Sequence, residues 1–238
     1  MSRRGTRIAV SVLTVYLVGV LANVAVAGQV SAPKVADKMK RIIASNWTCK
    51  NLQVKVLPFE NDAYTQAGRF QAVVFQADEV DNKGVVTAPV YIKAFDATVD
   101  MYALYYKDKI NITRRKNTAI EAKVSEQALN TMIARKKDLP IKNARVDLGN
   151  GIMTCTGDYQ AVVGHKLMMQ AKFVVENNTK INLVPTKVTV NGVPLPAGPI
   201  KSLLAKLNPI LDLTKMPLSP TLDTVTITDT HIILKDSV

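Results

Sequence analysis

The chain has 238 residues, a formal net charge of +12 and 47% hydrophobic residues. This length suits one large domain or two small ones, and it excludes a chain too short to bury a core of its own. The surplus of basic residues makes an anionic surface the first partner to consider, although the charge could also serve solubility alone.

Residues 1–27 resemble an export signal. Three arginines precede an uncharged run over residues 8–27, which ends in the Ala-Val-Ala pattern that signal peptidase recognises. We expect cleavage before Gly28, which leaves residues 28–238 as the functional domain. The alternative is a membrane anchor over residues 8–27, because about 20 apolar residues suffice to span a bilayer. Both interpretations predict an exported protein, in the periplasm or on the extracellular face of a cell envelope.

Removal of residues 1–27 takes away three arginines and no acidic residue, so the formal charge falls from +12 to +9. Outside the cytoplasm, such a charge favours anionic lipid and peripheral membrane contact as partners, and it argues against nucleic acid. Cys49 and Cys155 allow a disulfide in an exported chain, and two free thiols are the equal alternative.

The first half of the mature chain begins with a helical pattern and continues with strand-like runs. Apolar residues at a spacing of i, i+4, i+7 and i+8 predict an amphipathic helix over residues 32–46. Apolar and polar residues then alternate, in whole or in part, over residues 52–56, 69–80, 88–106 and 109–124. We interpret all four runs as strands.

The second half repeats this order of elements. Ser125 is placed to cap a helix over residues 125–136, and strand patterns follow over residues 141–148, 152–163, 166–176 and 180–193. Turns of hairpin length join these strands, so we expect antiparallel pairing. The sequence therefore predicts a single elongated α+β domain, in which a long, strongly twisted antiparallel sheet wraps around amphipathic helices.

A third helix is predicted near the C-terminus, ahead of a final strand pair over residues 221–229 and 231–235. Its apolar stripe runs over residues 200–211, and Pro209 should kink or end it. This stripe either closes the core of the sheet or lines a groove that holds an acyl chain. The pattern by itself leaves both alternatives open.

Catalysis is not indicated by any motif. The two histidines, His165 and His231, fall at expected turns and have no neighbouring ligands at metal-binding spacing. No nucleophile elbow, phosphate loop or dinucleotide fingerprint is present in the sequence. We therefore expect no enzyme activity, no metal and no cofactor.

A family resemblance adds to these observations. The segment "AKVSEQALNTMIA", the run from "IKNARVDLGNG" to "VTVNGVPLP" with Gly157 inside it, and the ending "LNPILDLTKMPLSPTLDTVTITDTHIILK" resemble the LmeA-like phospholipid-binding family, part of the tubular lipid-binding superfamily. The resemblance covers about residues 120–235. It implies an exported, non-enzymatic protein that binds lipid in an apolar groove and acts at the cell envelope, for example in lipid transfer.

Together, these observations predict a lipid-binding protein, and the alternative is a structural or interaction module with a closed core and no ligand. The basic side chains expected at a membrane surface, or else simply solvated, are Arg114, Arg115, Lys136 and Lys137. The residues expected to line the lipid groove are Met132, Ile133, Leu203, Leu204, Leu207, Ile210 and Leu211.

Overall fold

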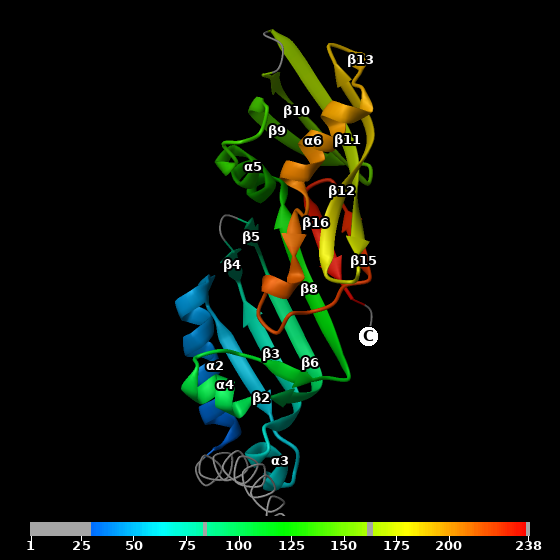
Figure 1. Cartoon of the computed structure of the whole chain (residues 1–238). Helices are drawn as coiled ribbons and strands as arrows, with labels where there is room; N and C mark the ends of the chain where they lie inside the picture. Colours follow the sequence, from blue (N-terminus) through cyan, green and yellow to red (C-terminus); the bar gives the residue numbers. More distant parts are fainter. Residues whose placement is uncertain (1–29, 83–84, 161–163, 237–238) are drawn as a thin grey trace, which may run out of the picture.

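The computed structural model describes residues 30–82, 85–160 and 164–236, which form one elongated molecule (Figure 1). The predicted export signal, residues 1–27, lies outside the described residues. Within them, no helix is long and apolar enough to cross a membrane. The helices are α2 (Ala32–Asn46), α3 (Asp62–Gln66), α4 (Met101–Tyr106), α5 (Glu126–Arg135), α6 (Ala197–Leu207) and the short 3-10 helix η1 (Leu213–Lys215).

In the described part of the chain, the first large sheet has seven antiparallel strands in the order β15-β16-β8-β6-β3-β2, with β7 paired to β6. Helix α2 packs on β2 and buries its predicted apolar stripe. The strands are β2 (Gln53–Leu57), β3 (Arg69–Ala77), β6 (Val90–Val99), β7 (Ile112–Arg114), β8 (Asn117–Ser125), β15 (Thr224–Ile227) and β16 (His231–Lys235).

Among the described residues, the second large sheet has six strands in the order β13-β12-β11-β10-β9, with β14 paired to β12. Helix α5 packs against β9 and helix α6 against β12 (Figure 1). A small sheet of three strands, β1-β4-β5, contacts α5 through β5. The strands are β9 (Ile141–Gly149), β10 (Ile152–Tyr159), β11 (His165–Glu176), β12 (Lys180–Val190), β13 (Val193–Pro194), β14 (Leu211–Asp212), β1 (Thr48–Lys50), β4 (Glu79–Asn82) and β5 (Val85–Thr87).

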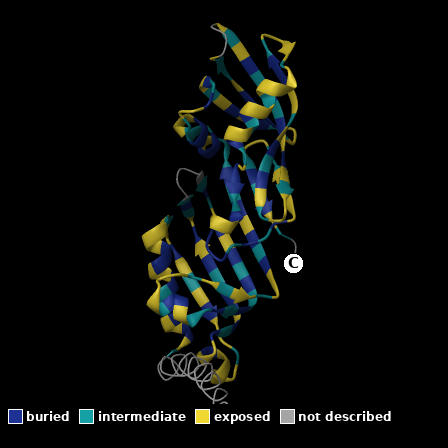
Figure 2. Ribbon diagram, in the orientation of Figure 1, coloured by how far each residue is buried: buried dark blue, intermediate teal, exposed yellow. Residues whose placement is uncertain are grey.

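The predicted α+β class and antiparallel pairing are confirmed, but the expected single long sheet is divided in two. Strand β8 already has β6 on one side and β16 on the other. The chain that leaves α5 therefore cannot pair with β8, and β9 begins a new sheet. The two sheets share one continuous core, and Figure 2 shows buried positions along the strands of both halves.

The ends of the predicted elements depend on capping side chains and prolines. The strand predicted over residues 88–106 stops at Val99, because the Asp100 side chain accepts a hydrogen bond from the Ala103 amide and caps α4. The third predicted helix ends at Leu207, in agreement with the expectation that Pro209 would kink or end it, because Pro209 has no amide hydrogen to continue it. Helix α3, begun by the cap Asn61, carries no long apolar pattern and is not predicted by the sequence.

Candidate functional site

The residues predicted to line a groove are mostly buried in the shared core. Met132 and Ile133 on α5 are each 5% exposed, and Leu203 and Leu207 on α6 are buried, whereas Leu204 is half-buried. The remaining two, Ile210 and Leu211, are buried as well. They lie beyond the end of α6, and Leu211 belongs to β14, so their predicted place on the helix is wrong.

An apolar cavity of about 10 Å³ lies at the junction of the two large sheets. Its lining combines β8 and β16 of the first sheet with β11, β12 and β14 of the second sheet, and α5 covers it. Ile210 and Leu211 are the predicted residues that border it. The complete lining is Val124, Leu129, Phe173, Ile181, Ile210, Leu211, Ile232 and Leu234. From the sequence, the other lining residues could be recognised only as apolar positions of strands and a helix. Their contact with one another depends on how the strands of the two sheets pair, which the sequence does not show.

Hydrogen bonds hold the segment after α6 against the second sheet. The Asn208 side chain accepts from the Leu183 amide at 2.8 Å and donates to the Leu183 carbonyl oxygen at 3.0 Å. The Ile210 amide donates to the Ile181 carbonyl oxygen at 2.8 Å. These hydrogen bonds fix the segment so that Ile210 and Leu211 lie beside the cavity and cover it from one side.

A larger, open cleft of about 700 Å³ lies where this segment reaches the first sheet. It is bounded by the end of α2, the loop between α4 and β7, and the turn after η1. In Figure 1, the orange segment that follows α6 runs beside β8 toward this region. The lining mixes charged, polar and apolar side chains, and it includes Ile42, Trp47, Asp108, Lys109, Ile110, Asn111, Arg115, Thr214, Lys215, Met216 and Leu218.

The predicted membrane-contact residues Arg114 and Arg115 have different surroundings. Arg114 is exposed on β7. Arg115 is half-buried in the cleft, where its Nη1 donates a hydrogen bond to the Leu218 carbonyl oxygen at 2.8 Å. Burial lowers the pKa of the Arg115 guanidinium from its ordinary value, which still leaves it charged at neutral pH.

The other predicted pair, Lys136 and Lys137, comes directly after α5 in the chain. Lys136 Nζ donates to the carbonyl oxygens of Lys206 and Leu207 at 3.0 and 3.4 Å, at the end of α6 where a cation is favoured. Burial lowers the pKa of Lys136. Lys137 is exposed. The structure therefore does not bring the four cations together in one cluster.

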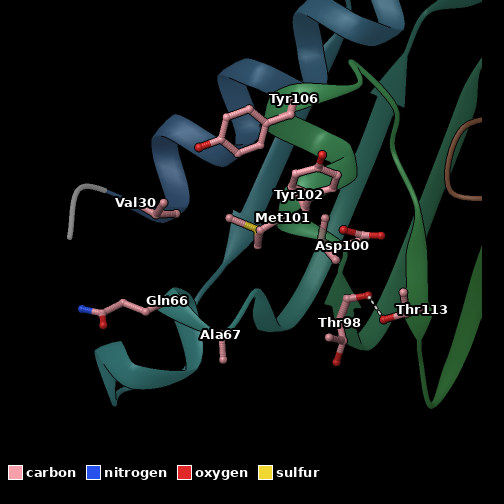
Figure 3. Close-up of a pocket in the computed structure, with 10 residues that line it drawn as sticks. Val30, Gln66, Ala67, Thr98, Asp100, Met101, Tyr102, Tyr106 and Thr113 are labelled. Atoms are coloured by element: carbon pink, nitrogen blue, oxygen red, sulfur yellow. Dashed lines mark hydrogen bonds between the residues drawn. The ribbon is translucent and has the colours of Figure 1, made fainter. Parts of the chain in front are cut away.

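A third cavity, of about 310 Å³, lies at the far end of the first sheet (Figure 3). Tyr102 and Tyr106 of α4 border it together with Val30 and Gln66, and Thr113 donates a hydrogen bond to the Thr98 carbonyl oxygen at its edge. Its lining has neither a converging set of charges nor a predicted site residue. We do not assign a ligand to it.

The disulfide considered for Cys49 and Cys155 is not formed, and both thiols are free. Cys49 is on β1 of the small sheet, whereas Cys155 is buried in β10 of the second large sheet, so different sheets hold them. Burial raises the pKa of Cys155 to about 11. No group of histidine, cysteine, aspartate or glutamate side chains suited to a metal ion occurs among the described residues.

Of three comparisons with known proteins, one gave a match. A search of curated proteins and a search of solved structures found no match. The family described as LmeA-like phospholipid-binding, by contrast, matches residues 64–235. The match covers most of the chain and extends beyond residues 120–235, where the sequence motifs carry the resemblance. The fold of two antiparallel sheets around an apolar junction thus belongs to a lipid-binding protein, and the chain is a member of the LmeA-like phospholipid-binding family.

Proposed function

We propose that this chain is an exported, non-enzymatic protein of the cell envelope that holds the acyl chains of a phospholipid, or of a related anionic lipid, between its two sheets. Transfer of lipid or maintenance of the envelope would then be its role. The observation that carries the proposal is the cavity at the sheet junction, whose lining is apolar throughout and comes from both sheets. An acyl chain has no hydrogen-bonding groups, so only such a lining can enclose it without leaving polar atoms unsatisfied.

The cavity must enlarge to hold a lipid. Its volume is about 10 Å³, whereas ligand pockets usually have volumes of roughly 300–1,000 Å³. The segment that carries Ile210 and Leu211 is the best candidate to move. Its strand β14 pairs with β12 over two residue pairs, and the Asn208 and Ile210 hydrogen bonds to β12 would break together with them. Displacement of this segment would open the lining on one side and leave the longer strand ladders intact.

Export is supported by the pattern of residues 1–27, and membrane contact by the basic side chains that remain exposed, such as Arg114 and Lys137. Each basic side chain near an anionic membrane contributes about 1 kcal/mol of attraction. Identification of Gly28 as the first residue of the secreted chain, by mass spectrometry, would test the predicted cleavage.

A closed structural module without a ligand is the second candidate. Its support is that six of the seven predicted groove residues are buried, with Leu204 half-buried. In that case the apolar junction serves folding alone, and lipid would be absent from the purified protein.

A reversible crosslink separates the two candidates. Lys180 and Asp212 are directly opposed on β12 and β14, and opposed antiparallel residues are close enough for a disulfide. We suggest the double variant Lys180→Cys/Asp212→Cys, with Cys49→Ser and Cys155→Ala to remove the native thiols. The single variant Lys180→Cys in the same background is the control.

Native mass spectrometry after incubation with phosphatidylglycerol vesicles gives the result. If the proposal holds, the control and the reduced double variant take up lipid, and the oxidised double variant does not. Uptake by the oxidised form would show that lipid enters elsewhere. Absence of lipid from every form, including the wild type, would favour the closed module.

A further inference from the structure

The open cleft beside Arg115 contains a basic group that the fold does not neutralise. Arg115 makes no ion pair with a carboxylate within the described part of the chain, and its recorded partner is the Leu218 carbonyl oxygen. A guanidinium has five N–H donors, so most of them remain available to a ligand. A half-buried cation without an anionic partner is costly to keep. An anionic group bound in the cleft would compensate for that cost.

The other side chains of the cleft favour an amphiphile over a small inorganic ion. Lys109 adds positive charge, whereas Lys215 is paired with Asp212 and Asp108 is paired with Lys38. The remaining walls combine apolar side chains, among them Trp47 and Met216, with uncharged polar ones such as Asn111 and Thr214. A phosphate with an attached apolar portion satisfies both parts of this lining, because Arg binds phosphate through paired hydrogen bonds.

The backbone at the Arg115 contact is strained. Leu218 and Ser219 have φ angles of 61° and 42°, a region that costs energy for residues other than glycine. The surrounding contacts maintain this turn: Arg115 binds the Leu218 carbonyl oxygen, and Thr118 Oγ1 accepts a hydrogen bond from the Thr221 amide at 3.0 Å. Such strain is concentrated at binding sites, where it holds groups in a fixed position.

The cleft is connected to the apolar junction through one segment of chain. Ile210 and Leu211 border the cavity, and Met216 and Leu218, a few residues later, border the cleft. All four side chains belong to the same hydrophobic core. A lipid whose chains enter the junction beside β14 could therefore place its head group in the cleft.

We propose that this cleft is the head-group subsite, in which Arg115 binds the phosphate of an anionic phospholipid with the help of Lys109. This inference rests on the proposed lipid-binding function and adds a selectivity for anionic over zwitterionic head groups. Both kinds of head group carry the phosphate, so the preference comes from the trimethylammonium group of a zwitterionic lipid such as phosphatidylcholine, which the positive charges of Arg115 and Lys109 repel. We expect a preference of roughly tenfold for the anionic lipid.

The single tryptophan of the chain, Trp47, lines the cleft and reports on its occupancy. We suggest titrating the protein with short-chain phosphatidylglycerol, short-chain phosphatidylcholine and inorganic phosphate, and following Trp47 emission. The key variants are Arg115→Gln and its control Lys116→Gln, which removes one positive charge from the neighbouring exposed position outside the lining. The wild type and Lys116→Gln should prefer phosphatidylglycerol roughly tenfold, and Arg115→Gln should lose this preference.

A second pair of variants tests the subsite in case Arg115→Gln does not fold. Lys109→Glu places a negative charge in the cleft without removing the Leu218 contact, and Lys107→Glu makes the same change on an exposed residue outside the lining. The first variant should weaken phosphatidylglycerol binding by roughly tenfold, and the second should change it by less than about threefold.

Three outcomes would overturn the subsite. Equal losses in the Arg115→Gln and Lys116→Gln variants, or in the Lys109→Glu and Lys107→Glu variants, would show general charge attraction. A response to inorganic phosphate as strong as that to phosphatidylglycerol would assign a free anion instead of a lipid. If the wild type carries lipid by mass spectrometry but Trp47 does not respond, the subsite fails while lipid binding stands. If the wild type carries no lipid, the proposed function itself fails.

Discussion

Asn130 on α5 provides both hydrogen bonds that the backbone of Val146 on β9 would otherwise make with a neighbouring strand. The Asn130 side-chain oxygen accepts from the Val146 amide at 2.7 Å, and its side-chain nitrogen donates to the Val146 carbonyl oxygen at 2.9 Å. Strand β9 is the edge of the second sheet. The Glu126 carboxylate accepts from the Leu148 amide in the same way, so α5 covers this edge and protects it from pairing with another chain.

The first prediction concerns this contact. Asn130→Asp keeps the acceptor for the Val146 amide but replaces the donor with a charged oxygen that faces the Val146 carbonyl. We expect the free energy of unfolding to fall by about 1–3 kcal/mol. Gln127→Glu adds the same charge on an exposed position of α5 and should change it by less than about 0.5 kcal/mol. Urea denaturation measures both, and equal effects would contradict the role of Asn130.

A second prediction compares two glycines. Gly157 lies in β10 at a shift in the pairing with β9, where an added Cβ would be 2.4 Å from Ile141 Cγ2 and 2.9 Å from the Lys142 carbonyl oxygen. Gly157→Ala should therefore destabilise the fold, by about 1–3 kcal/mol. At Gly198 in α6 an added Cβ meets nothing within 4 Å. Because Gly198 lies in the first turn of α6 and precedes Pro199, Gly198→Ala should change stability by less than about 0.5 kcal/mol, and thermal denaturation should separate the two variants.

The third prediction concerns the free thiols. Burial raises the pKa of Cys155 from 9.0 to about 11, so little reactive thiolate exists at pH 8. Iodoacetamide should modify half-buried Cys49 well before Cys155 in the native protein. Two thiols per chain should react after unfolding without a reductant. Failure to detect them would indicate the disulfide that the structure lacks.

The same pKa shift predicts how stability changes in alkaline solution. Above pH 9 the unfolded chain loses the Cys155 proton, whereas the folded chain keeps it until about pH 11. The folded state then binds more protons, so its stability should fall by about 1.4 kcal/mol per pH unit across this window. Cys155→Ala should remove this component, and denaturant titrations from pH 8 to pH 11 would compare the two proteins. Parallel curves would contradict the assignment.

A further prediction tests the cavity at the sheet junction directly. Ile232 on β16 borders the cavity, and the next residue, Ile233, is half-buried and is not part of its lining. Ile232→Phe should fill the space, lower stability by about 1–3 kcal/mol and reduce the lipid recovered per molecule of purified protein. Ile233→Phe makes the same change at the neighbouring position and should retain lipid. Equal lipid content in the two variants would place the acyl chains elsewhere.

The elements that follow from local pattern could be predicted from the sequence. The helix over residues 32–46 matches α2, and Ser125 caps α5 as expected, with its side chain accepting from the Ala128 amide. The alternation over residues 166–176 likewise became β11. Periodicity and capping act within a few residues, so one chain segment contains the information that determines them. The antiparallel α+β class followed from the same local signals, whereas the family was indicated by the resemblance of residues 120–235.

The tertiary structure decided everything that depends on distant partners. The sequence could not show that β6 and β16 occupy both sides of β8, and therefore that β9 starts a second sheet. Nor could it separate Arg114 from Arg115, since the half-buried state of Arg115 depends on Leu218, 103 residues away. The apolar junction arises in the same way, from strands of both sheets. Charge, capping and periodicity are properties of a segment, whereas burial and strand pairing are properties of the assembled fold.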